Sequence, residues 1–382
     1  MKTYEHLKMF LRRNIDTIFV MMGNECNLNC KYCLQHPMVE HPISHEINPD
    51  IYDFIEQVCK ENINIPLDVR FWGGEPLVFF PVIKQMVEEL EKRELPVKFS
   101  TMTNGKLLDE EKLQYCIDHK IHLALSWDGP NVLETRGYDA FKDNKDILLK
   151  VPNLCISSVM SAKAYPKEII AGFKMFDEEY QKVWGHHVGT NIDDIFDTGG
   201  VPDEMTDMDY DRVSKEIAEM TEHYLKFKAT GKQLWESDNY FEDKYMDDLF
   251  YNAYYFYSDH DGCNNGKWEG SWCCCGNGYT VLNMGLDGKL YPCHNTSHSI
   301  GTIYTGYFNY LKTLIKEDTT FHNREVCKDC EVICYCHGGC KMVSEENRKK
   351  TYCKLKKAIY TPFLSALNEL GGNLLEKEEV DN

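Results

Sequence analysis

Between residues 16 and 190, short runs of β-branched and aromatic residues alternate with amphipathic segments. The runs lie at 16–22, 67–72, 97–103, 121–127, 154–160 and 182–188. The segments between them, such as 48–62 and 81–94, repeat apolar residues at helical spacing. This alternation predicts a parallel sheet, closed or partly closed as a (β/α)6 TIM-type barrel. An open doubly wound sheet is the alternative, which the lack of G-x-G-x-x-G after the first run weakens.

The charge of the chain limits its partners. Its 382 residues include 42 Lys and Arg against 61 Asp and Glu, a formal charge of −19. This charge argues against non-specific binding to nucleic acid or to an anionic membrane, and favours a basic peptide or a neutral small molecule as partner. No apolar run approaches the roughly 20 residues of a membrane span, and the N-terminus lacks the apolar core of a signal peptide. We therefore expect a cytoplasmic protein.

The chain contains seventeen cysteines, which without a secretory signal indicate metal ligation rather than a disulfide framework. Three lie near the N-terminus and eleven lie between Cys263 and Cys353. The other three, Cys59, Cys116 and Cys155, fall in apolar segments and are expected in the core.

The composition divides the chain into four expected parts. The barrel covers 1–190, and an acidic, aromatic, helical connector covers 191–262. A cysteine-rich module follows over 263–370, where turns dominate and metal clusters would supply much of the folding energy. The last part, 371–382, is expected to be a solvated tail.

The loop after the first predicted strand reads ECNLNCKYC, which places Cys26, Cys30 and Cys33 at the C-terminal mouth of the barrel. Three thiolates can hold three irons of a [4Fe–4S] cluster and leave the fourth iron open to a small molecule. A zinc site is the alternative. The second strand is followed by GGEP, residues 73–76, where consecutive glycines let the backbone approach a ligand closely.

These motifs resemble the radical S-adenosylmethionine (radical SAM) superfamily. Its signature C-x3-C-x-aromatic-C matches Cys26, Cys30, Tyr32 and Cys33, and GGEP, TNG (103–105) and SWDGP (126–130) follow in order. The resemblance implies that S-adenosylmethionine binds the open iron and yields a 5′-deoxyadenosyl radical that abstracts a hydrogen atom. The cofactor-binding residues it implies are Tyr32, Gly73, Gly74, Glu75, Pro76, Asn104, Ser126, Asp128 and Arg136.

The C-terminal cysteines resemble the seven-cysteine pattern of the SPASM domain, which binds two auxiliary [4Fe–4S] clusters. The spacing C-x2-C-x5-C-x3-C-x12-C covers Cys327, Cys330, Cys336, Cys340 and Cys353. By resemblance, the outer cluster is held by Cys327, Cys330, Cys336 and Cys353, and the inner cluster by Cys275, Cys293 and Cys340. Cys273, Cys274 and Cys263 are further candidates for the inner cluster, and Cys334 lies outside the pattern. Structural zinc is again the alternative.

The resemblance implies an oxidoreductase acting on a peptide or protein side chain. The expected reactions are thioether or carbon–carbon crosslinking, or oxidation, in the maturation of ribosomally made peptides, with a flavodoxin or ferredoxin as external electron donor. Alternatives are formylglycine formation as in anaerobic sulfatase maturases, a small-molecule dehydrogenase or mutase, and a non-catalytic electron-transfer or zinc-scaffold protein.

One residue departs from the sulfatase-maturase pattern. Those enzymes carry a catalytic Asp directly after the cysteine that matches Cys293, whereas this chain has His294. A histidine can act as a base near neutral pH, so His294 is the predicted catalytic residue, with a polar surface residue as the alternative. His186 and His187 are expected to end the sixth strand, with one of them facing the barrel interior.

Overall fold

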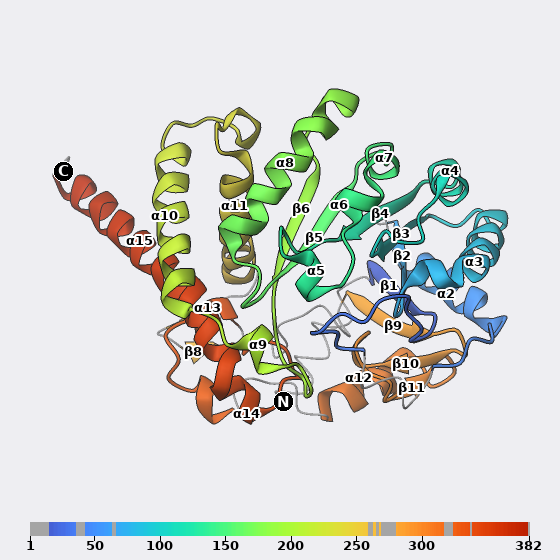
Figure 1. Cartoon of the computed structure of the whole chain (residues 1–382). Coiled ribbons are helices and arrows are strands. Elements are labelled where there is room, and N and C mark those ends of the chain that lie inside the picture. Colours follow the sequence, from blue (N-terminus) through green and yellow to red (C-terminus); the bar gives the residue numbers. More distant parts are fainter. Residues whose placement is uncertain are drawn as a thin grey trace.

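A computed structural model describes residues 15–35, 43–62, 66–258, 263–264, 267–268, 280–316, 324–336 and 338–380. Six strands run parallel and in sequence order across its main sheet (Figure 1). They are β1 (Thr17–Met21), β2 (Leu67–Trp72), β3 (Val97–Thr103), β4 (Ile121–Ser126), β5 (Cys155–Met160) and β6 (Gly189–Asp194). The prediction of a partial (β/α) barrel is confirmed.

Helices follow the strands and cover the outer face of the sheet. They are α2 (Asp50–Glu61), η2 (Pro76–Phe79), α3 (Phe80–Lys92), α4 (Glu110–Asp118), α5 (Val132–Thr135), α6 (Ala140–Asp143), α7 (Lys145–Leu148) and α8 (Pro166–Trp184). Strand β2 shows how the two faces differ. Leu67, Val69 and Phe71 are fully buried with the apolar faces of α2 and α3, whereas the alternate residues Asp68 and Arg70 are half-buried. Because side chains alternate along a strand, these alternate residues point into the barrel.

The sixth strand was predicted wrongly. Residues 182–184 end α8, and Gly185 at φ +72° caps that helix in the left-handed conformation. Strand β6 begins at Gly189, so His186 and His187 lie in the connecting loop, where His187 Nδ1 lies 2.7 Å from Asp177 Oδ2. The sequence of β6, GTNIDD, has few strand-forming residues, and its conformation comes from pairing with β5.

The connector contributes α9 (Asp203–Thr206), α10 (Tyr210–Lys228), η3 (Leu234–Glu236) and α11 (Tyr240–Ser258). Helix α10 packs against α11 and against the C-terminal helix α15 (Cys353–Val380), as Figure 1 shows. Two expected boundaries fall inside elements. Strand β6 crosses residue 190, and α15 continues through 371–380, where a solvated tail was expected.

The cysteine-rich part continues the barrel sheet. Strand β9 (Val281–Gly285) pairs parallel with β1, and β10 (Lys289–Tyr291) and β11 (Gly301–Thr302) extend the sheet with antiparallel pairing. The remaining elements are β7 (Cys263–Asn264), β8 (Lys267–Trp268), α12 (Tyr307–Lys316), η5 (Glu325–Cys327), α13 (Ile333–Cys336), α14 (Glu345–Asn347) and η6 (Arg348–Tyr352). Within the described residues, none of the helices combines the length and the apolar character needed to cross a membrane.

Candidate active site

Four loops meet at the carboxyl edge of the sheet. The cysteine loop follows β1, GGEP follows β2, TNG ends β3 and SWDGP ends β4. Parallel strands end at the same edge, so the four motifs that the sequence orders along the chain lie side by side in space. The candidate site is therefore built from loops that the barrel positions.

The three cysteines of the first loop lie close together. Cys26 is exposed, whereas Cys30 and Cys33 are half-buried, and each of the first two interacts electrostatically with the other thiols. Burial raises the pKa of Cys30 to about 12, against the opposing effect of the Arg136 guanidinium. The Leu28 backbone N–H donates to Cys26 Sγ at 3.4 Å. Such amide donors to sulfur also occur around iron–sulfur clusters, so this loop fits a cluster ligand set.

GGEP packs directly on the cysteine loop. The Gly74 N–H donates to Gly23 O at 3.0 Å, and the Glu75 N–H donates to Glu25 O at 2.9 Å. A Cβ at Gly74 would lie 2.3 Å from the Glu25 carbonyl oxygen, and one at Gly73 would lie 2.6 Å from the Gly23 oxygen. The sequence predicted a close approach to a ligand here. In the structure, the glycines allow a close approach to the cysteine loop.

Glu75 ties three loops together. Its carboxylate accepts hydrogen bonds from Thr103 Oγ1 at 2.8 Å, from the Asn104 N–H at 2.8 Å and from the Leu77 N–H at 3.0 Å. Its side chain is 1% exposed, and this burial raises its pKa. Asn104 Nδ2 in turn donates to Asn27 Oδ1 of the cysteine loop at 2.8 Å. Pro76 begins η2, which the Glu75 carboxylate caps.

Asp128 is the centre of a second buried network. Both oxygens accept from the guanidinium of Arg136, at 2.9 and 2.8 Å, and Oδ2 also accepts from the hydroxyls of Tyr32 and Thr135. The Val159 N–H completes the set at 3.1 Å. Asp128 is fully buried, and its role as a cofactor-binding residue stays a prediction. Asp128 thereby contacts both Tyr32 and Arg136, whose guanidinium lies 5.5 Å from the Tyr32 ring centre.

The barrel interior carries polar groups that sequence reasoning missed. Arg70 pairs with Asp68 at 2.6 Å and donates to Ser100 at 3.0 Å. At the opposite end of the six parallel strands, Asp193 of β6 accepts from Ser157 of β5 at 3.5 Å. The Asp193 side chain is exposed to solvent, yet its pKa is raised. The cause is desolvation, because protein atoms of the barrel interior surround the carboxylate even though water can still reach it. The predicted site residue Ser126 ends β4, half-buried and on the same inward face.

His294 lies inside the barrel. Its ring stacks on Phe19 of β1 with centroids 4.3 Å apart and meets Trp72 of β2 edge-on at 4.7 Å. Phe19 and Trp72 both belong to the inward-facing set of their strands. Cys293, the residue before His294, is buried, and its Sγ accepts a hydrogen bond from the Asn295 N–H at 3.4 Å. The segment after β10 therefore brings a predicted cluster ligand and a predicted base to the barrel side by side.

The four predicted ligands of the outer cluster are neighbours. Cys327, Cys336 and Cys353 each interact electrostatically with Cys330, and burial raises the pKa of all three, that of Cys336 to about 12. Among the described residues, no three His, Cys, Asp or Glu side chains converge on a single-ion position. Ligands of a four-iron cluster surround a larger group, so thiols that are neighbours without converging fit such a cluster.

The loop before Cys353 is fixed by a buried arginine. Arg348 donates to the carbonyl oxygens of Gly338, Cys340 (2.8 Å) and Val343 (3.0 Å). The bond to the Cys340 carbonyl holds this predicted ligand of the inner cluster near the predicted ligands of the outer cluster. The other predicted ligands Cys273, Cys274 and Cys275 lie outside the described residues, as does the side chain of Cys263.

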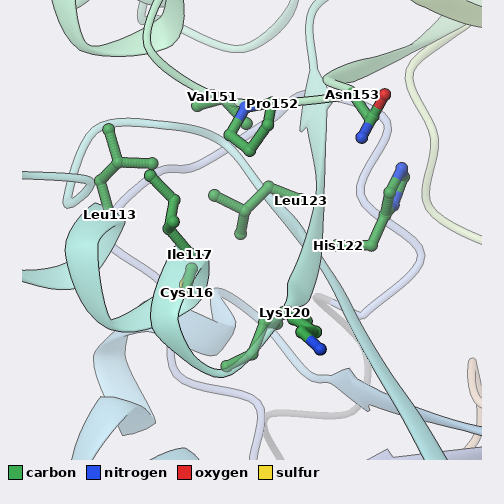
Figure 2. Close-up of a pocket in the computed structure, with 10 residues that line it drawn as sticks. Leu113, Cys116, Ile117, Lys120, His122, Leu123, Val151, Pro152 and Asn153 are labelled. Atoms are coloured by element: carbon green, nitrogen blue, oxygen red, sulfur yellow. The ribbon is translucent and has the colours of Figure 1, made fainter.

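A pocket in Figure 2 lies away from this site. Leu113, Ile117, Leu123, Val151 and Pro152 contribute most of its apolar lining, and it opens between α4 and the start of β4. The start of a parallel strand lies at the edge opposite the cysteine loop, and the pocket wall is mainly apolar. We assign it no part in the chemistry.

Comparison with known proteins agrees with this geometry. The family model of the radical SAM superfamily matches residues 20–190. The radical SAM cyclopropyl synthase TigE of Paramaledivibacter caminithermalis is 22% identical over 382 residues, covering 88% of this chain and 71% of TigE. The cysteine-type anaerobic sulfatase-maturating enzyme of Clostridium perfringens is 23% identical over 387 residues, covering 91% of this chain and 96% of that enzyme.

Two solved structures share the fold over most of the chain. The structure of anSMEcpe with bound AdoMet and Cp18Cys peptide has a TM-score of 0.63 at 18% identity, covering 94% of this chain and 99% of anSMEcpe. Streptococcus suis SuiB bound to precursor peptide SuiA has a TM-score of 0.57 at 14% identity, covering 89% of this chain and 75% of SuiB. Radical SAM enzymes use a [4Fe–4S] cluster and S-adenosylmethionine, and the cysteine loop offers three neighbouring thiols at the barrel mouth. Residues 20–190 of this chain are therefore a radical SAM domain, and the protein is a radical SAM enzyme.

Proposed function

We propose that this enzyme oxidises or crosslinks a side chain of a peptide or protein. The observation that carries the proposal is the adjacency of Cys293 and His294, with the histidine stacked on Phe19 inside the barrel. After hydrogen abstraction, the substrate radical would lose an electron and a proton. An auxiliary cluster ligated by Cys293 beside the barrel interior would take the electron, and His294 would take the proton. Relatives that carry bound peptides in their solved structures, anSMEcpe and SuiB, support a peptide as substrate.

The roles at the barrel mouth follow from the contacts. Cys26, Cys30 and Cys33 would hold the first cluster, leaving one iron to the amino and carboxylate groups of S-adenosylmethionine. Tyr32 and Arg136, which Asp128 holds at the mouth, and Ser126 at the end of β4 would contact the cofactor. Glu75 would keep the GGEP and TNG loops, with Asn104, in register with the cysteines.

Inside the barrel, the chain excludes water and moves a proton. When bound, S-adenosylmethionine supplies a 5′-deoxyadenosyl radical that removes a hydrogen atom from the substrate. An imidazole nitrogen of His294 would take the proton that the oxidised substrate releases, because histidine titrates near neutral pH. The inward faces of Phe19 and Trp72 hold this ring in place.

The C-terminal part would bind two auxiliary clusters as a SPASM module over 263–370, with the connector over 191–262 and the barrel before it. Cys327, Cys330, Cys336 and Cys353 would hold the outer cluster. The inner cluster would use Cys293 and Cys340 with cysteines of 273–275. The proposal places the enzyme in the cytoplasm, where a reducing thiol pool keeps cysteines available for iron.

Anaerobic reconstitution tests the proposal. We expect about twelve irons per chain, as three four-iron clusters require, and formation of 5′-deoxyadenosine with a reductant. Incubation with cysteine- and serine-containing peptides should then remove two hydrogens from a peptide, measured by mass spectrometry. Bound zinc without cofactor cleavage would contradict the proposal. Cofactor cleavage that modifies only small molecules would favour a dehydrogenase.

Formylglycine formation is the second candidate. The alignment with the Clostridium perfringens sulfatase-maturating enzyme over 96% of its length favours it. On a cysteine peptide this reaction first removes two hydrogens to give a thioaldehyde, which water then converts to the aldehyde with release of hydrogen sulfide. Exchange of sulfur for oxygen in the product mass separates it from crosslinking, which keeps the sulfur in the peptide.

A further inference from the structure

The part of the chain around the proposed outer cluster has a charge opposite to the rest. Residues 324–357 contain nine Lys and Arg against five Asp and Glu, a net charge of +4, whereas the whole chain carries −19. A basic region in an acidic protein attracts an acidic partner over long range and orients the encounter.

Four of these lysines share one helical face with a cluster ligand. Lys349, Lys350, Lys354 and Lys357 are exposed and recur at helical spacing along η6 and the start of α15. Residues three and four apart lie on one side of a helix, so Cys353, which is half-buried, lies among them. We call Lys349, Lys350, Lys354 and Lys357 the basic face.

The ion pairs on this face leave its lysines available. Lys350 reaches Asp203 at 2.6 Å and Lys357 reaches Glu331 at 3.1 Å, but both lysines are about half exposed. Lys354 lies 5.9 Å above the ring of Tyr210. Exposed pairs of this kind contribute little to stability, so a charged partner can replace them.

The charges also reach the thiols themselves. Arg348 interacts electrostatically with Cys327 and Cys353, and Lys357 with Cys330 and Cys353. The buried Lys356, paired with Asp194 of β6, does the same for Cys336. Cationic side chains therefore accompany all four thiols, and Cys330 and Cys353 remain partly open to solvent.

We propose that the basic face is the docking surface for a small acidic one-electron carrier, a ferredoxin or flavodoxin type of protein, which exchanges electrons with the outer cluster. Each encounter moves one electron, and the carrier is oxidised as the cluster is reduced, or the reverse. The inference rests on the outer cluster of the proposed function. Electron-transfer encounters use small interfaces, for which a few lysines around a half-exposed ligand are sufficient.

Charge reversal in the iron-loaded enzyme tests this surface. The variant K349E/K354E changes two lysines of the basic face, and K60E/K92E changes two exposed lysines of α2 and α3 by the same charge. Binding of a purified acidic ferredoxin would be measured by calorimetry at about 50 mM and about 200 mM salt. We expect K349E/K354E to bind about tenfold more weakly at the lower salt and to lose most of the salt dependence, with K60E/K92E near wild type.

A second measurement separates docking from cluster loss. The rate at which reduced ferredoxin bleaches the clusters should fall with K349E/K354E, whereas dithionite should reduce all variants equally. If K349E/K354E loses iron, the milder K349Q/K354Q replaces it and should show a smaller loss of affinity.

The docking surface would be overturned if K349E/K354E bound ferredoxin as tightly as wild type, or if K60E/K92E lowered the affinity for ferredoxin by the same factor. Zinc or too little iron in the wild-type enzyme would instead overturn the proposed function, so the two failures are distinguishable.

Discussion

Asp128 illustrates how single residues organise this site. It is fully buried and bonds to Tyr32, Thr135, Arg136 and the Val159 N–H, so one carboxylate fixes an aromatic ring and a cation at the barrel mouth. The Glu75 carboxylate likewise joins the loop after β2 to the loop after β3, by accepting hydrogen bonds from Thr103 and Asn104. In both cases a buried acidic side chain joins groups from separate loops at the carboxyl edge of the sheet.

The ion pair between Arg136 and Asp128 should be essential for stability. Arg136→Gln leaves a buried carboxylate without its counter-charge, and we expect a loss of about 3–5 kcal/mol in the free energy of unfolding. Tyr32→Phe removes one hydrogen bond to that carboxylate and should cost about 1.5–3 kcal/mol. Urea unfolding of the iron-free protein measures both. Arg93→Gln, which removes partly exposed ion pairs with Asp53, Glu56 and Glu89 at the surface, is the control and should cost about 1 kcal/mol or less.

Glu75 should make stability depend on pH. Burial raises its pKa above the ordinary 4.5, so its contribution to stability is complete below pH 4.5 and is lost as pH rises through the folded-state value. The glutamine of Glu75→Gln does not titrate. The stability of wild type relative to Glu75→Gln should therefore decline from pH 4.5 upward, measured by urea unfolding at several pH values. A difference that is constant with pH would show that Glu75 keeps an ordinary pKa.

His294→Phe should separate radical formation from product formation. The phenyl ring can keep the stacking on Phe19 but cannot take a proton. If His294 is the base, product formation falls by about 10²- to 10⁴-fold, while 5′-deoxyadenosine still forms. Chromatography of both products from one reaction measures the ratio. His298→Phe, at an exposed position of the same segment, should leave that ratio unchanged.

At the scale of elements, the site depends on how closely two loops approach. GGEP and the cysteine loop are joined by backbone hydrogen bonds at Gly74 and Glu75, and no side chain fits between them. The position of the three thiols is thus set by a neighbouring strand's loop as well as by their own.

Gly74→Ala should displace the cysteine loop. Its Cβ would lie 2.3 Å from the Glu25 oxygen and 2.4 Å from the Asn24 oxygen, both of them backbone atoms. We expect the variant to lose about four irons per chain, those of the first cluster, because its ligands move. Iron analysis and electron paramagnetic resonance after reconstitution measure this. Gly301→Ala meets only ordinary contacts from 3.5 Å outward and should keep the wild-type iron content.

At the scale of the whole molecule, the barrel and the cysteine-rich part form one structure. Strand β9 covers the edge of β1, and α15 packs on α10 of the connector. His294 enters the barrel from the segment that follows β10. The cysteine-rich module expected over 263–370 therefore shares the barrel's sheet through β9.

A chain ended at residue 262 should therefore fold poorly. It would leave the β1 edge unpaired and remove the helix that packs on α10, which exposes a template for aggregation. We expect most of it to be insoluble or aggregated by size-exclusion chromatography. A chain ended at residue 370 keeps β9 and the packed start of α15, and should elute as wild type does. A soluble, monomeric 1–262 would show that the barrel is independent.

Hydrophobic periodicity and short-range spacing are local properties, so they were enough to predict the barrel, its first five strands and the order of the motif loops. The sequence also identified the four neighbouring cysteines from Cys327 to Cys353. The strand GTNIDD could not be predicted in this way, since its pairing with β5 outweighs its weak strand propensity. The same holds for Asp128 as a buried support, Asp193 inside the barrel and the parallel pairing of β9 with β1, which depend on contacts between residues far apart in the chain.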